Sequence, residues 1–375
     1  MKQLLIITAL LLGSISHLHS QETKEKKIKK YWNSLVNGHI DKTFEKKIDM
    51  NYIIAPCYTR EGSFGIGGAA TGLYRLDRSD SIMQPSDISL SGSIQSKGFY
   101  GITVKGNNFF KGDKSRLSYR LQFLNKNLDF WGVSYDACSR NPISGYKRQM
   151  INWESDYIYK LTKNFHLGAA FNMNYTKASN VITPAYLEGQ RDSYFFTGIG
   201  VSASYDTRDF ILNPKRGIYF MVKEVYYPKF VSTHNKNIFG TTIIFDYYQK
   251  AWKGSVFAFD LYGQYNGRNT PWALREELGS GTSRMRGYYA GHYMDNNQIT
   301  AQLELRQHIY SRVGCVAWVG GGTVFPSFEK LRTRNILPNY GLGLRVEFKH
   351  NVNIRIDYGF GKETAGFVFQ FAEAF

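Results

Sequence analysis

Long segments in which apolar and polar residues alternate occur from about residue 49 to the last residue of the chain. The segment QITAQLELRQHI, residues 298–309, has an apolar residue at every second position through Leu305, with polar or charged residues between them. YGLGLRVEF at 340–348 and VNIRIDYGFG at 352–361 follow the same rule. Successive side chains of a strand point to opposite faces, so a period of two indicates strands with one apolar and one polar face.

A soluble sandwich and a membrane barrel both produce this alternation, and the connections separate them. The predicted strands often reach about ten residues, whereas strands of soluble proteins average about five or six. Short gaps at 111–113, 161–164, 310–312 and 349–351 alternate with long gaps at 126–145, 178–191, 268–296 and 327–337. Short turns at one end and long loops at the other are typical of outer-membrane barrels, in which the short turns face the periplasm. We therefore predict an all-β fold, a transmembrane antiparallel β-barrel of about 16 strands.

The predicted strands divide the chain into three parts. They lie near 49–58, 62–76, 86–96, 98–110, 114–125, 146–161, 163–177, 192–206, 215–229, 236–249, 253–267, 297–309, 312–325, 338–348, 351–361 and 365–375. The barrel is thus expected over 49–375, after a segment at 21–48 and a signal peptide at 1–20. An even strand count leaves both ends of the barrel on the periplasmic side.

The N-terminal residues indicate export. Lys2 precedes an apolar stretch at 4–15, which is too short for a membrane-spanning helix and of the length found in signal peptides. A cleavage point after Ser20 fits this pattern. Residues 21–48 contain apolar residues at helical spacing among lysines, which predicts a short amphipathic helix, a short plug or an unstructured leader. We expect the protein in the outer membrane of a Gram-negative bacterium.

Charge and cysteine content limit the partners. The formal net charge is +17, and removing Lys2 with the signal peptide leaves 17 − 1 = +16. A solvated surface, nucleic acid or anionic lipid head groups would each suit this charge; an exported chain rarely meets nucleic acid, so we expect contact with outer-membrane lipids, including lipopolysaccharide. Cys57, Cys138 and Cys315 have no metal-ligand spacing, and one disulfide among them stays open. No metal or cofactor is expected.

Five motifs occur in a defined order. Arg286-Gly287-Tyr288 lies in the long gap after the eleventh predicted strand. YDTRDFILNPKRG occupies 205–217, WVGGGTVF 318–325, RIDYGFG 355–361 and FVFQFAEAF 367–375. In this order and spacing the motifs resemble the BamA/TamA family of outer-membrane protein assembly and translocation barrels, within the bacterial surface antigen superfamily.

The resemblance implies a loop that folds back into the lumen and is locked to the barrel wall. Arg286 needs an acidic partner because a guanidinium removed from water is costly unless it is paired. Asp357 is the partner that the family pattern implies, while Glu347, Glu304 and Asp260 are open alternatives.

Neighbouring motif residues have expected roles as well. Gly287 permits the bend behind Arg286, and Tyr288 and Tyr289 are expected to stack on a glycine-rich wall. That wall consists of Gly320, Gly321 and Gly322. The alternating aromatics Phe369, Phe371 and Phe375 resemble the C-terminal signal that barrel assembly machinery reads.

The resemblance has one departure. Family members that assemble or translocate proteins carry periplasmic POTRA domains before the barrel, and residues 21–48 are too few for one. Client outer-membrane proteins, or a separate periplasmic partner, are the expected partners of a monomeric barrel.

A barrel of this kind could serve three functions. The first is assembly, insertion or translocation of outer-membrane proteins. The second is a passive channel, whose Lys and Arg lining would favour anions. The third is an enzyme, which the sequence does not favour: the histidines are scattered and no Gly-x-Ser-x-Gly turn is present. No catalytic residues are therefore predicted.

Overall fold

The computed structural model describes residues 43–59, 61–80, 83–211, 213–268, 270–279, 283–349, 352–371 and 373–375. The predicted signal peptide at 1–20 and nearly all of the segment at 21–48 lie outside the described residues. The described strands belong to one compact unit, formed by residues 42–347 and 351–375.

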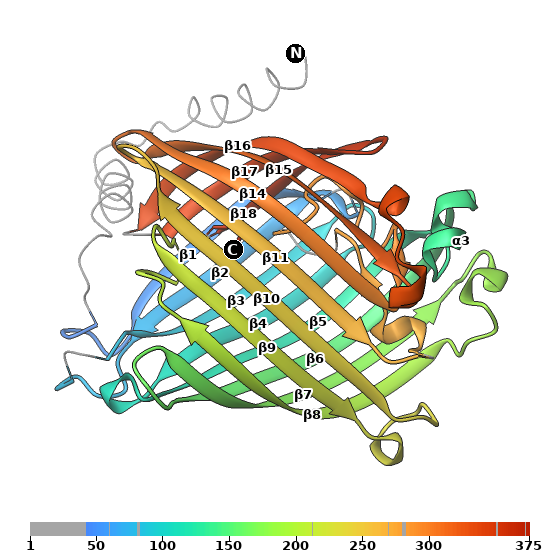
Figure 1. The fold of residues 1–375 in the computed structure, drawn as a ribbon, viewed down its shortest axis with the longest axis horizontal. Coiled ribbons are helices and arrows are strands. Elements are labelled where there is room, and N and C mark those ends of the chain that lie inside the picture. The colour runs from blue at the N-terminus through green and yellow to red at the C-terminus, as the bar shows by residue number, and fades with distance from the viewer. Residues whose placement is uncertain are drawn as a thin grey trace, which may run out of the picture. The chain divides into compact units, whose positions relative to one another are not determined.

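Sixteen strands form a single sheet in which neighbours in the sequence are neighbours in space (Figure 1). They are β1 (Asp49–Thr59), β2 (Ser63–Tyr74), β3 (Ser86–Gln95), β4 (Tyr100–Phe109), β5 (Ser115–Phe130), β6 (Ser144–Lys160), β7 (Phe165–Ser179), β8 (Ser193–Asp206), β9 (Gly217–Tyr227), β10 (Ile238–Lys250), β11 (Ser255–Asn266), β14 (Asn297–Tyr310), β15 (Val313–Phe325), β16 (Leu337–Lys349), β17 (Val352–Gly361) and β18 (Thr364–Phe371). The edge strands β1 and β18 contact each other, so the sheet curls into a barrel. The predicted fold class is confirmed.

The remaining elements are short and lie in the connections. A separate two-stranded ladder joins β12 (Glu276–Glu277) to β13 (Met294–Asp295). The single α-helix among the described residues is α3 (Tyr135–Arg140), and single 3-10 turns lie in several connections. No described helix has the length and apolar character that crossing a bilayer requires.

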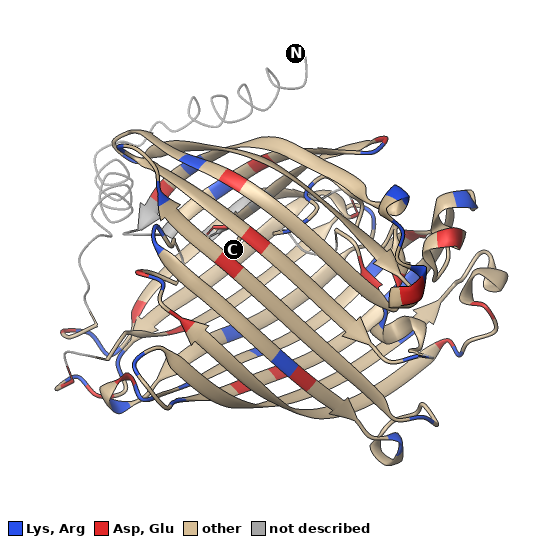
Figure 2. Ribbon diagram, in the orientation of Figure 1, with Lys and Arg blue, Asp and Glu red and all other residues tan. Residues whose placement is uncertain are grey.

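The alternation seen in the sequence sorts the side chains into two faces. On β14, Leu303 is exposed on the outer face whereas Glu304 is fully buried on the inner one. The pairing of Leu303 with Val319, and of Glu304 with Trp318, carries the same two faces onto β15. Figure 2 shows charged residues gathered at the two ends of the strands, with isolated ones along them. The outer face is thus apolar, as lipid contact requires.

The two ends of the barrel differ. We call the end with the connections 110–114, 161–164, 251–254 and 311–312 the turn end, and the end with 131–143, 180–192, 228–237 and 267–296 the loop end. A cluster of buried apolar residues fills the lumen at the loop end and includes Phe130, Phe196, Trp272 and Leu278. No such cluster lies at the turn end among the described residues.

The last strand is shorter than the sequence suggests. The predicted strand runs to Phe375, whereas β18 ends at Phe371. The ring of Phe375 lies 6.2 Å from that of Tyr248, and an oxygen of Phe375 accepts a hydrogen bond of 3.1 Å from Arg306. Because Arg306 is an inner-face residue of β14, these contacts hold Phe375 inside the barrel. The alternation therefore stops before the end of the chain.

Candidate functional site

The connection between β11 and β14 enters the lumen instead of extending into solvent. Its described residues are 267–268, 270–279 and 283–296, and we call it the lumen loop. Met285, Arg286, Tyr288 and Tyr289 at its tip are each at most 5% exposed. A loop of this composition is buried only when the barrel wall supplies partners for its polar groups.

Arg286 is surrounded by acceptors from two strands. Its Nη1 donates to Asp357 Oδ2 of β17 at 2.8 Å, and its Nη2 donates to Glu304 Oε1 of β14 at 2.5 Å. Gln302 accepts a further hydrogen bond from Nη2 at 3.2 Å. The guanidinium also lies 3.6 Å from the centre of the Trp318 ring on β15. Charge-assisted hydrogen bonds and a cation–π contact together compensate the loss of water around this charge.

The carboxylates that hold Arg286 bind further arginines. Glu304 Oε2 lies 2.9 Å from Arg306 Nε, and Asp357 Oδ1 lies 2.5 Å from Arg345 Nη1. Arg355 Nη1 is 3.4 Å from Asp357 Oδ2. The buried network therefore continues along the wall from β14 to β17, and Arg286 joins the lumen loop to it.

The C-terminal residues complete this network. Glu373 Oε2 accepts a hydrogen bond of 2.8 Å from Arg345 Nε and lies 3.9 Å from Arg306 Nε. Burial by itself raises the pKa of Glu373, but Arg306 and Arg345 lower it by a larger amount. Four arginines, 286, 306, 345 and 355, face three carboxylates, 304, 357 and 373, so the network carries 4 − 3 = +1. Nearly every buried charge here is compensated.

The backbone of the tip fits against the backbone of β17. Gly287 has a φ of 95°, which only glycine adopts readily, and a Cβ there would lie 2.3 Å from the carbonyl oxygen of Gly359. A Cβ on Gly359 would lie 2.1 Å from the carbonyl oxygen of Arg286. Asn339 Nδ2 donates to that same oxygen at 2.5 Å, and Thr364 Oγ1 donates to the Gly287 oxygen at 2.9 Å. Two facing glycines thus let the loop and the wall touch.

The two tyrosines of the tip reach different parts of the wall. Tyr288 lies against Gly361; its hydroxyl donates to the Pro338 oxygen at 2.7 Å and accepts from the Lys362 amide at 2.8 Å. The Tyr289 hydroxyl accepts from the Asp129 amide of β5 at 2.9 Å. The tip therefore bridges β17 to β5.

Further ion pairs hold other parts of the lumen loop. Arg284 Nε lies 2.9–3.0 Å from both carboxylate oxygens of Asp260 on β11. Glu277 on β12 pairs with Arg148 of β6. The Arg148–Glu277 pair could not be predicted from the sequence, because both partners are single charges that belong to no motif. The contacts of Gly359 and Asn339 with the loop tip were also not predicted from the sequence, although Gly359 lies within the motif RIDYGFG.

The structure places the residues singled out in the sequence as follows. Asp357, the partner that the resemblance implies, and Glu304, one of the open alternatives, both bind Arg286, whereas Asp260 binds Arg284. The backbone amide of Glu347 donates to the Arg312 oxygen at the turn end. The side chains of Phe369 and Phe371 lie outside those the structure describes.

The expected stacking of the tyrosines on the glycine-rich wall is not what the structure shows. Cβ atoms built on Gly320 and Gly322 would meet residues of β14, namely Ala301, Gln302 and Thr300. A Cβ on Gly361 would instead meet the Tyr288 ring at 2.2 Å. The glycine that leaves room for the ring is thus on β17, because the tip passes closest to that strand.

Cysteines and metal ligands form no site among the described residues. Cys57, Cys138 and Cys315 are free, so the disulfide left open in the sequence does not form. Burial raises the pKa of the Cys138 thiol on α3 to about 12. The described part of the chain contains no group of three or more His, Cys, Asp or Glu side chains able to hold a metal ion.

Comparison with known proteins places this geometry among membrane barrels. The model of the Omp85 superfamily domain matches residues 88–375. The structure resembles BamA from Haemophilus ducreyi lacking POTRA domains 1–3, at 13% identity and a TM-score of 0.55 over 87% of this chain and 70% of that one. It also resembles CdiB from Acinetobacter baumannii, at 12% identity and a TM-score of 0.54 over 87% and 60% of the two chains.

A third similar structure is CdiB from Escherichia coli, at 11% identity and a TM-score of 0.57 over 88% of this chain and 63% of that one. The chain thus spans between 60% and 70% of the length of these three proteins. At such identities the likenesses show the fold. A search of curated proteins found no match.

Proposed function

Since the chain belongs to the Omp85 superfamily of outer-membrane barrels, we propose that it inserts or translocates outer-membrane proteins, with the lumen loop fixed to the wall through Arg286. The observation that carries this proposal is the Arg286 side chain, which is 0% exposed and binds carboxylates on two separate strands. Removing one partner of a buried ion pair commonly costs about 3–5 kcal/mol. We therefore treat this loop as a stable structural element inside the lumen.

The seam between β1 and β18 is the place where we propose that a client strand is received. Edge strands offer unpaired backbone groups to which an extended segment adds by hydrogen bonding. Ile54 on β1, Ile66 on β2 and Phe367 on β18 are all more than half exposed, so the seam faces lipid with apolar side chains. The same proposal includes three further points. The barrel acts as a monomer, it contacts outer-membrane lipids including lipopolysaccharide, and it works with a separate periplasmic partner.

A passive channel that favours anions is the second candidate. The inner faces of β4 and β5 carry Lys105, Arg116 and Arg120, which form a basic strip along one wall. Such a strip attracts anions. The lumen loop and its apolar cluster fill the loop end, so this candidate requires the loop to leave the lumen.

Liposomes containing the purified protein test the first candidate. An unfolded outer-membrane barrel is added from urea, and its folding is followed by resistance to protease. We expect faster folding than in empty liposomes, and a loss of that gain in Arg286→Ala. Arg268→Ala is the matched control, because Arg268 lies in the same loop and pairs with Glu329 while both side chains are more than three-quarters exposed. Equal folding with and without the protein would refute the proposal.

Planar-bilayer conductance separates the two candidates. A steady, anion-selective current in the wild-type protein, unchanged in Arg286→Ala, would favour the channel. A small current that rises in Arg286→Ala and not in Arg268→Ala would agree with a loop that closes the lumen.

A further inference from the structure

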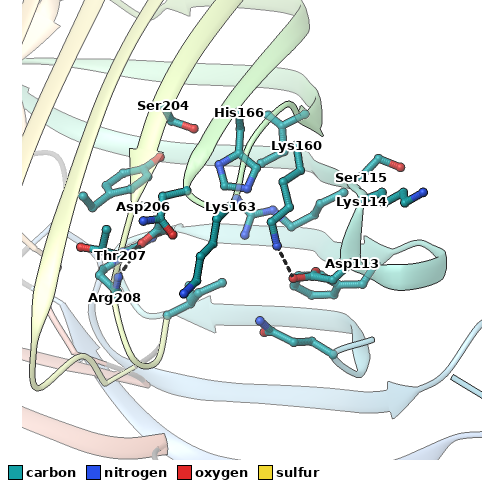
Figure 3. A pocket seen from close by; sticks show the side chains of 17 residues that line it. Asp113, Lys114, Ser115, Lys160, Lys163, His166, Ser204, Asp206, Thr207 and Arg208 are labelled. Carbon is teal, nitrogen blue, oxygen red and sulfur yellow. Dashed lines mark hydrogen bonds and ion pairs between the residues drawn. The ribbon is translucent and has the colours of Figure 1, made fainter. Parts of the chain in front are cut away.

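A cavity of about 480 Å³ opens inside the barrel at the turn end (Figure 3). Four connections meet there, namely those between β2 and β3, β4 and β5, β6 and β7, and β8 and β9. This volume lies within the range of about 300–1,000 Å³ that ligand pockets commonly have. None of the contacts of Arg286 extends to this cavity.

The cavity has more positive than negative groups. Two ion pairs lie within its lining, Lys160 with Asp113 at 3.6 Å and Arg208 with Asp206 at 2.7 Å. Lys114, Arg116 and Lys163 also line it, and no described carboxylate lies within ion-pair distance of any of these three. The lining therefore carries a surplus of three positive charges before His166 is counted.

Two nitrogen atoms of the lining are buried without a hydrogen-bond partner in the protein. They are Nε of Arg116 and Nδ1 of His166. Buried polar atoms are nearly always hydrogen-bonded, so each such exception requires an explanation. Figure 3 shows His166 and Lys163 directed into the same space, from β7 and from the turn before it. An anionic ligand in the cavity would neutralise the surplus positive charge and would give these two nitrogen atoms a hydrogen-bond partner.

The arrangement of the charges favours an extended ligand. Lys114 and Lys163 lie on different turns and Arg116 on β5, so the three come from separate elements and not from one cradle. Phe109, Ile158 and Tyr219 supply apolar surface in the same lining. A single phosphate would leave this apolar surface unused, whereas a peptide with acidic and apolar residues would use both.

We propose that this basic cavity binds an acidic, partly apolar segment of an extended polypeptide at the periplasmic mouth of the lumen. Identifying that polypeptide as a client or accessory protein rests on the proposed function; the binding itself does not. The cavity faces the lumen, because Arg116 pairs with Ile158 and His166 with Ser204 on the inner faces of their strands. Lipid head groups outside the barrel are thus not its ligand.

Fluorescence anisotropy of the full-length protein in a non-ionic detergent tests this. The probe is a short labelled peptide in which Glu and Leu alternate. The variant is Lys114→Gln/Arg116→Gln/Lys163→Gln, and the control is Arg268→Gln/Lys330→Gln/Arg332→Gln, which removes the same charge from exposed positions at the loop end. We expect the first variant to bind at least about tenfold more weakly and the control to bind as the wild type does.

Peptide controls on the wild-type protein keep the test decisive if the triple variant fails to fold. A Gln/Leu peptide and a Lys/Leu peptide should both bind at least about tenfold more weakly than the Glu/Leu peptide, and added salt should weaken Glu/Leu binding. Equal binding of all three peptides, or an equal loss in both triple variants, would overturn the proposal. Displacement of the peptide by inorganic phosphate at the peptide's own concentration would overturn it in favour of a small-anion site. Because the assay contains no client folding, its outcome is separate from that of the liposome experiment.

Discussion

Two groups of arginines that face the lumen use the same residue type in opposite ways. In the network that binds the lumen loop, Arg286 and Arg345 are buried, and each binds carboxylates at 2.8 Å or less. At the turn end, Arg116 and Lys163 line an open cavity and have no described carboxylate within ion-pair distance. Arginines that are paired with carboxylates cross-link a structure, whereas arginines without such a partner remain available to a ligand. The sequence alone does not distinguish the two groups of basic residues. They differ in whether the tertiary structure gives them carboxylate partners.

Arg286→Ala should give the largest effect, because it leaves Glu304 and Asp357 buried with fewer cations. We expect the free energy of unfolding to fall by about 3–5 kcal/mol. Urea titration followed by electrophoretic mobility of the folded barrel measures this. Arg268→Ala removes an exposed pair in the same loop and should cost about 0–1 kcal/mol. Similar losses in the two variants would contradict the role of Arg286 as a buried cross-link between the loop and the wall.

Gly359→Ala should be the next largest, since its Cβ would lie 2.1 Å from the Arg286 oxygen. Overpacking of this kind costs about 1–3 kcal/mol. The control is Gly366→Ala on β18, the cross-strand partner of Gly359, where a Cβ would make an ordinary contact of 3.5 Å with Gly287. Protease cleavage of the lumen loop should increase in the first variant only. Equal cleavage in both would place the tip elsewhere.

Tyr289→Phe isolates the contact of the tip with β5. The substitution leaves the Asp129 amide without its acceptor, and an unsatisfied donor costs about 1–3 kcal/mol. Tyr310→Phe is the control, because that side chain is 79% exposed. Amide hydrogen exchange at Asp129 should speed up in Tyr289→Phe alone; unchanged exchange would show that β5 does not depend on the loop.

Glu276 on β12 should make the lumen loop sensitive to pH. Burial, with help from neighbouring Glu277, raises the pKa of Glu276 from its ordinary value of 4.5 to about 8. The folded state therefore holds this proton more tightly than the unfolded state, so stability falls as pH rises from 4.5 to about 8. Glu276→Gln should gain stability relative to the wild type over that window. A difference that does not vary between pH 5 and pH 9 would refute this.

The smallest effect on stability is expected at the turn end. Arg116→Gln removes a charge with no carboxylate at ion-pair distance, and substitutions away from such networks usually change stability by about 0.5 kcal/mol or less. The same urea titration measures it. A loss as large as that of Arg286→Ala would show that Arg116 is a structural cross-link, which would remove the contrast between the two groups of arginines.

Much of the fold was predictable because barrel strands obey a local rule. A period of two assigns each residue to one face from its immediate neighbours alone, so the strand number, the inner face and the sites of long loops followed from the sequence. The end of β18 could not be predicted in this way, because Glu373 and Phe375 turn toward Arg345 and Arg306, which are distant in sequence. The place of the Tyr288 ring was wrong for the same reason.

The alternation in the sequence by itself assigned Asp260, Glu304, Glu347 and Asp357 to the inner face, and the family resemblance added Arg286 to the lumen. The sequence did not determine which of them meet, because pairing depends on the height of each residue along a tilted strand and on the path of a long loop. The tertiary structure placed Arg286 between Glu304 and Asp357 and gave Asp260 to Arg284. The face to which a side chain points is a property of the local backbone, whereas contact across a lumen is a property of the closed barrel.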